Sequence, residues 1–76
     1  MYEQIIAVLK EIRPDVDFAN EKSLIDGGVL DSFDIISIVS ELNNEFDIEI
    51  NVNDLLPENF NSVSAMQELI EKLQNE

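Results

Sequence analysis

Three segments of this chain repeat their apolar residues with the period of an α-helix, and none sustains the alternation of a β-strand. They cover about residues 2–13, 32–46 and 62–73. Pro14 ends the first segment, and a helix needs one apolar stripe to pack against a core. We therefore predict an all-α fold, a small bundle of three main helices plus one short helix, in a single domain of residues 1–76.

A long connection, residues 14–30, separates the first two predicted helices. Loops of this length in a small domain are uncommon and are usually functional or contain a helical turn. Four apolar residues make it too hydrophobic for a free linker: Val16, Phe18, Leu24 and Ile25. We expect them to fasten the loop against the helices. Near its end, Gly27-Gly28 supplies backbone freedom just before the second helix.

The segment from residue 47 to 52 alternates apolar and polar residues, but it has no partner strand and would be unstable as an isolated strand. We interpret it as an extended loop whose Ile48, Ile50 and Val52 cover the core. A helical turn is expected at about residues 53–56, and a short third helix or turn at residues 58–60.

The second predicted helix carries two apolar stripes. The wider stripe consists of Ile35, Ile38, Val39, Leu42 and Phe46. Phe33 and Ile36 begin the other stripe, and a helix with one face toward a core does not need both. Either the helix is buried all round or Phe33 and Ile36 form a docking patch for a partner. We favour docking, because 76 residues can hardly bury a helix on every side.

The chain is strongly acidic, with 17 acidic residues, four basic residues and a net charge of −13. Such a charge repels nucleic acids and anionic membranes and favours basic protein surfaces. No apolar run reaches the roughly 18 residues of a membrane span, and the N-terminus lacks the basic region of a signal peptide. We expect a cytoplasmic monomer that binds protein partners and neither binds nucleic acid nor spans a membrane.

Ser32 is the strongest candidate for a functional residue. It lies at the predicted start of a helix, where unpaired backbone N–H groups and the helix dipole favour an anion. The chain has no histidine and no cysteine, so Ser32 lacks an obvious base, and we predict no enzyme and no zinc site. A calcium-like run from Asp15 has Asn20 where the loop needs glycine, so no metal is expected. The alternative is that Asp31 or Ser32 is only a helix N-cap.

The residues around Ser32 carry a family resemblance. Asp31-Ser32-Phe33-Asp34 precedes an amphipathic helix that closes on Glu45-Phe46, followed by Ile48-Glu49-Ile50. This constellation resembles the acyl carrier protein family, the phosphopantetheine-binding carriers, over nearly the whole chain. The resemblance implies that a phosphopantetheinyl transferase moves 4′-phosphopantetheine from coenzyme A to the Ser32 hydroxyl, which would make the chain a phosphoprotein. The thiol of the arm would then hold acyl groups as thioesters.

The resemblance also implies roles for the residues near Ser32. Asp31 would engage the transferase and its magnesium ion, and Asp34 would contact the transferase. Phe33 and Ile36 would dock partner enzymes, with core positions as the alternative. Acidic contacts to basic surfaces of acyl-loading and acyl-using enzymes would come from Glu41, Glu45, Asp47 and Glu49.

The cargo is less well defined by the sequence than the attachment point. Our first interpretation is an acyl carrier protein of fatty acid biosynthesis or related lipid metabolism. Ser37, Asn43 and Asn44 stand where the fatty-acid pattern has acids, and the long segment 53–60 looks closer to aminoacyl carriers. The alternative is therefore a D-alanyl or peptidyl carrier protein. An alternative of another class is an acidic helical interaction module without a prosthetic group.

Overall fold

The computed structural model describes residues 1–75, and these residues form helices joined by irregular segments, without a strand. The elements are α1 (Tyr2–Ile12), α2 (Ser32–Phe46), a 3₁₀ helix (Val52–Asp54), α3 (Pro57–Phe60) and α4 (Val63–Gln74). The all-α prediction of three main helices and a short one is confirmed, with helix ends within one or two residues of those expected. Over residues 1–75, every helix is too short or too polar to cross a membrane.

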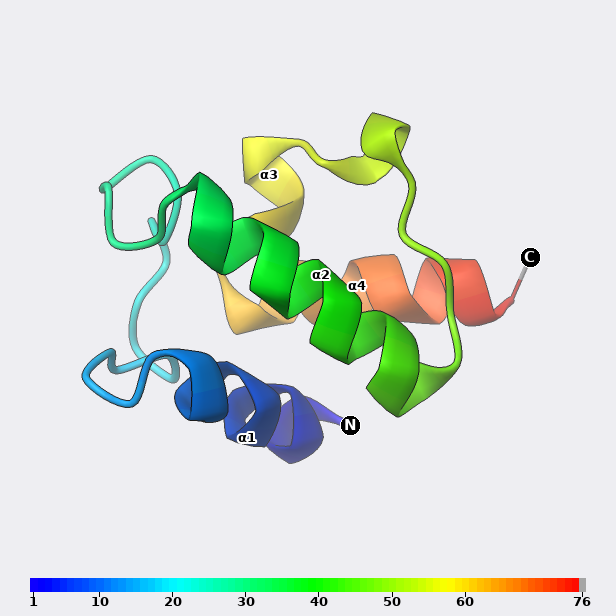
Figure 1. The fold of residues 1–76 in the computed structure, drawn as a ribbon, viewed down its shortest axis with the longest axis horizontal. Helices are drawn as coiled ribbons and strands as arrows, with labels where there is room; N and C mark the ends of the chain where they lie inside the picture. Colours follow the sequence, from blue (N-terminus) through cyan, green and yellow to red (C-terminus); the bar gives the residue numbers. More distant parts are fainter. Residues whose placement is uncertain (76) are drawn as a thin grey trace.

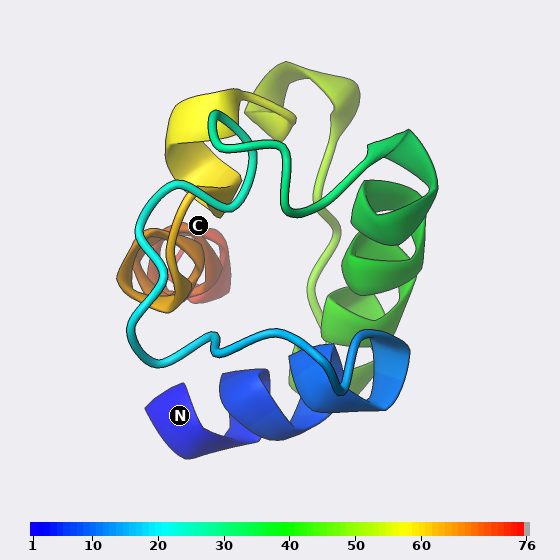
Figure 2. The same cartoon turned by 90° about the vertical axis from the view of Figure 1, so that its left-hand side faces the viewer.

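The three longer helices surround one apolar core. α1 packs against both α2 and α4, and α3 packs against α4 (Figure 1). Figure 2 shows the connection between α1 and α2 running past α4 and α3 before it reaches α2. The side chains of the three longer helices that have no exposed surface are Ile5, Leu9, Ile38, Leu42, Met66 and Ile70. The helical period of the sequence therefore identified the core face of each long helix.

The long connection is fastened to the rest of the fold, as predicted. Phe18 and Leu24 are buried, and the N–H of Leu24 donates to the carbonyl of Asn61 at 2.9 Å. The amide oxygen of Asn61 accepts from the N–H groups of Ile25 and Asp26, each at 3.0 Å. Asn61 precedes α4, so one side chain ties the loop to that helix. The loop is therefore a structural part of the bundle.

The start of α4 is capped by the residue that follows Asn61. The hydroxyl oxygen of Ser62 accepts from the N–H of Ala65 at 3.1 Å. A serine hydroxyl at this position satisfies one of the N–H groups that a helix N-terminus leaves unpaired. Ser62 is thus the cap of α4, and Asn61 is free to hold the long connection.

The segment after α2 is an extended loop, but it covers the core with fewer residues than predicted. Asp47 ends α2 in a left-handed conformation, and the N–H of Ile50 donates to the side-chain oxygen of Asn43 at 2.9 Å. Ile50 is buried and Ile48 is half-buried. The expectation that Val52 covers the core is wrong, since its side chain is 84% exposed. The chain enters the 3₁₀ helix at Val52, and this turn ends the alternation that would have pointed the side chain inward.

Candidate functional site

Ser32 is the first residue of α2 and is exposed, while Asp31 caps the helix. A carboxylate oxygen of Asp31 accepts from the N–H of Asp34 at 3.0 Å. In return, Asp34 Oδ2 accepts from the N–H of Asp31 at 3.2 Å. This reciprocal arrangement satisfies two N–H groups at the helix start. The N-cap role belongs to Asp31, so Ser32 is exposed to solvent on a first turn whose N–H groups are capped.

The turn that leads to Ser32 depends on the glycine pair. Gly28 has a φ of 73°, a conformation that other residues rarely adopt. A Cβ on Gly27 would lie 2.6 Å from the carbonyl oxygen of Ser23, to which the Gly27 N–H donates at 2.7 Å. Leu30 follows with a buried side chain. The backbone freedom expected at this pair is therefore used to bring the chain sharply into α2.

Arg13, at the end of α1, is bound to this same turn. Its Nη1 donates to Asp34 Oδ2 at 2.7 Å and to the carbonyl of Val29 at 3.2 Å. Nε and Nη2 donate to the two carboxylate oxygens of Asp15, each at 3.1 Å. Hydrogen bonds from Arg13 lower the pKa of Asp15. The carboxylates of Asp15 and Asp34 in turn raise the pKa of Arg13. Sequence reasoning missed this network, whose only signal is that Arg13 is the sole arginine of the chain.

The two faces of α2 differ sharply in exposure. Phe33 is 81% exposed and Ile36 is 66% exposed, whereas Ile38 and Leu42 are fully buried. Phe33 and Ile36 are therefore surface residues, and the alternative that they belong to the core is wrong. Ile36 lines an open groove between α1 and α2. Glu11 and Ile12 of α1 and Ser37, Ser40 and Glu41 of α2 form the rest of its lining. An apolar side chain in a groove with two carboxylates suits a partner surface that combines apolar and basic groups.

The other acidic residues singled out by the sequence differ in their surroundings. Glu41, Glu45, Asp47 and Glu49 are exposed along the second half of α2 and the loop after it. Asp34 is different, since its side chain is only 15% exposed and lies within the cap and the Arg13 ion pair. The exposed acids are thus available to a partner, while Asp34 already holds the start of α2 in place.

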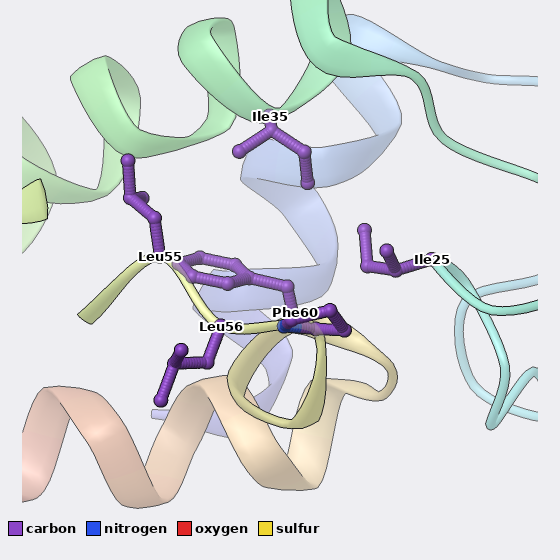
Figure 3. Close-up of a pocket in the computed structure, with 6 residues that line it drawn as sticks. Ile25, Ile35, Leu55, Leu56 and Phe60 are labelled. Atoms are coloured by element: carbon purple, nitrogen blue, oxygen red, sulfur yellow. The ribbon is translucent and has the colours of Figure 1, made fainter. Parts of the chain in front are cut away.

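A small apolar cavity lies on the other side of α2, and sequence reasoning did not find it. Ile35 of α2, Ile25 of the long connection and Phe60 of α3 line this cavity together (Figure 3). Leu55, Leu56 and Pro57 complete the lining. Its volume is about 80 Å³, well below the roughly 300–1,000 Å³ of sites that enclose a drug-sized ligand. The cavity has no polar group to receive a charge.

Within residues 1–75, no three side chains of the ligand types His, Cys, Asp and Glu gather closely enough to hold a metal ion.

Comparison with known proteins identifies a family match and several relatives. The family described as "Phosphopantetheine attachment site" matches residues 3–73. The chain is 34% identical over 61 residues to the D-alanyl carrier protein of Streptococcus uberis, covering 80% of this chain and 77% of that protein. It is 30% identical over 73 residues to the D-alanyl carrier proteins of Streptococcus sanguinis and Streptococcus gordonii, covering 95% of this chain and 92% of each relative.

Proposed function

The chain belongs to the family of proteins with a phosphopantetheine attachment site, and on that basis we propose that it is an aminoacyl carrier whose arm is attached to Ser32. Carriers of this family bear covalent 4′-phosphopantetheine and are not catalysts. The observation that carries the choice of residue is the exposed position of Ser32 on the first turn of α2, inside the matched region.

The surroundings of Ser32 fit the group that it would carry. A phosphodiester on the Ser32 oxygen would lie at the N-terminus of a 15-residue helix, where the dipole favours negative charge. The thiol at the end of the arm supplies the nucleophile that holds cargo as a thioester, which explains how a chain without cysteine can serve as a carrier. Ser32 contributes the point of attachment, and α2 orients it.

Asp31 is the residue that we assign to the transferase and its magnesium ion. One of its carboxylate oxygens caps α2, and the exposed side chain leaves the carboxylate accessible to an ion brought by the enzyme. A transferase contact at Asp34 has less support, because its carboxylate is held by Arg13 and by the N–H of Asp31.

Two observations favour an amino acid cargo over a fatty acyl cargo. The relatives named above are D-alanyl carrier proteins. The cavity of about 80 Å³ leaves little room for a long hydrocarbon chain, and each methylene left in water costs about 0.8 kcal/mol relative to burial. An ammonium group would instead remain in solvent, since the cavity lacks polar partners. The fatty-acid interpretation, placed first from the sequence, is thus the less supported of the two.

The partners that we propose are a phosphopantetheinyl transferase and an amino acid–activating ligase with a basic docking surface. Phe33 and Ile36 offer apolar contacts, and Glu41, Glu45 and Asp47 offer acidic ones. Charge complementarity of this kind raises the rate of encounter more than the final affinity. We further propose that the chain acts as a monomer and as one domain, with the exposed face of α2 open to successive partners.

The cargo can be tested by comparing two loading enzymes in parallel reactions. The holo chain would be offered D-alanine and ATP with an amino acid–activating ligase, and in parallel a long-chain fatty acid and ATP with a fatty acyl ligase. Intact mass and hydroxylamine sensitivity would report the thioester. We expect kcat/KM for D-alanine loading to be at least about tenfold higher, a difference of about 1.4 kcal/mol. Faster loading of the fatty acid would overturn the aminoacyl assignment while leaving the attachment site intact.

A further inference from the structure

One guanidinium nitrogen of Arg13 holds the chain on both sides of Ser32. Nη1 donates to the carbonyl of Val29, three residues before Ser32, and to the carboxylate of Asp34, two residues after it. The shorter of these contacts, at 2.7 Å, is a charge-assisted hydrogen bond. The backbone carrying Ser32 thus has its path fixed at two points by a residue that belongs to α1.

The other side of the guanidinium is occupied as well. Nε and Nη2 form a parallel pair of hydrogen bonds to Asp15, so four hydrogen bonds leave Arg13. The planar fork of arginine sets the directions of these bonds, and a lysine ammonium on a flexible stem cannot reproduce them. Because Asp15 already fixes the side chain, little entropy is lost when it binds the turn before α2. The network therefore joins three segments, the end of α1, the long connection and the start of α2.

We propose that Arg13 is a positioning residue that sets the orientation of Ser32 for arm transfer. This inference rests on the proposed function, since it assumes that Ser32 receives the arm. Asp31 and Asp34 flank Ser32 and would repel an incoming phosphate. Arg13 pairs with Asp34 and offsets one of these two charges, while its second bond, to Val29, holds the preceding turn. Arg13 thus sets both the position of Ser32 and the local charge around it.

The effect of Arg13 on arm transfer should appear mainly in kcat. The docking residue Ile36 lies one helical turn beyond Ser32 and does not contact Arg13 through these bonds, so binding of the transferase should change little. A hydroxyl that samples more orientations spends less time in line with the reacting phosphorus, and a displacement of about 1 Å can cost about 100-fold in rate. We expect Arg13→Gln to lower kcat of phosphopantetheinyl transfer about tenfold, with KM changed less than about twofold.

Three variants separate position from charge. Arg13→Gln removes both the planar guanidinium group and its charge. Arg13→Lys keeps a positive charge without the planar guanidinium group. Lys72→Gln, on the exposed surface of α4, is the matched control, because it changes the net charge by the same amount. Transfer would be measured with coenzyme A and magnesium at a temperature where each variant is folded by circular dichroism. We expect Lys72→Gln to match the wild type and Arg13→Lys to recover only part of the lost kcat.

A second readout does not depend on the arm. Hydrogen exchange of the unmodified chain should show faster exchange at the amides of Asp31 and Asp34 in Arg13→Gln, with the centre of α2 unchanged. If exchange and kcat of the folded variant both match the wild type, the positioning role of Arg13 is wrong. If exchange rises but kcat does not fall, Arg13 is structural only and the proposal is also overturned. Absence of modification in the wild type would instead count against Ser32 as the attachment point.

Discussion

The two apolar faces of α2 look alike in sequence and differ in the folded chain. Ile38 and Leu42 have no exposed surface, whereas Phe33 and Ile36 have most of their side chains in water. Burial of the first pair contributes to folding through the hydrophobic effect, and the second pair gains little from folding. The contrast teaches that the two faces of one helix have different roles: one face holds the bundle together, and the other stays exposed, where we propose that partners dock.

The largest expected effect comes from breaking the buried face. Leu42→Ala should lower the free energy of unfolding by about 2–5 kcal/mol, because it removes a fully buried side chain and leaves a cavity. A domain of this size has only about 3–5 kcal/mol of stability to lose. Urea denaturation followed by circular dichroism would measure the change. Ile36→Ala is the matched control and should change stability by less than about 0.5 kcal/mol; equal losses in the two variants would remove the distinction between the faces.

The second largest effect is expected from a substitution on the exposed face of α2. Ile36→Asp should leave the unfolding curve nearly unchanged and lower kcat/KM of the transferase about tenfold or more, because a charge replaces an apolar contact at an interface. Val52→Asp provides a control, since Val52 is also an exposed apolar residue but lies outside α2. A loss of helix content in Ile36→Asp would show that Ile36 is needed for the fold. An equal loss of transfer in Val52→Asp would show that the exposed face of α2 has no special role.

Substitutions of Asp31 should have a smaller effect, and they separate its role as the cap of α2 from its proposed role in arm transfer. Asp31→Ala should cost about 1 kcal/mol in the free energy of unfolding, because the N–H of Asp34 loses its partner. Asp31→Asn can still cap and should keep most of that stability, but it lacks the charge for a magnesium ion and should slow arm transfer. Thermal unfolding and transfer kinetics of the two variants would show this. If the asparagine variant transfers at the wild-type rate, the proposed magnesium role of Asp31 does not hold.

The smallest effect concerns pH at the Arg13 network. Arg13 lowers the pKa of Asp15, so the ion pair adds stability above the unfolded-state pKa of Asp15 and loses it as pH falls through the folded-state value. Exposure of both groups keeps the contribution small. We therefore expect the midpoint of urea unfolding to fall slightly more between pH 5 and pH 3 in the wild type than in Asp15→Asn. Parallel pH curves for the two proteins would show that the pair adds no stability.

The three longer helices were largely predictable from sequence because each has a strong apolar period. Pro14 stops the first helical pattern, and Asp31-Ser32 opens the second. Val52 escaped prediction because a two-residue alternation does not reveal where a chain turns. Its exposure follows from the 3₁₀ helix that begins there.

The candidate site was predictable only where its residues are neighbours in sequence. Ser32 and Asp31 follow from the start of one helix and from the family resemblance. The Arg13–Asp34 pair joins residues 21 positions apart and arises only from the packing of α1 against α2. The apolar cavity is likewise lined by side chains from three separate segments, so no local sequence pattern predicts it.

The central claim is that Ser32 carries the phosphopantetheine arm, and intact-protein mass spectrometry tests it most directly. The chain, its Ser32→Ala variant and a Ser37→Ala control would each be incubated with coenzyme A, magnesium and a broad-specificity phosphopantetheinyl transferase. Our account predicts that the wild type and Ser37→Ala each gain the mass of one phosphopantetheine and that Ser32→Ala gains none. No gain in the wild type, or an equal gain in Ser32→Ala, would contradict it.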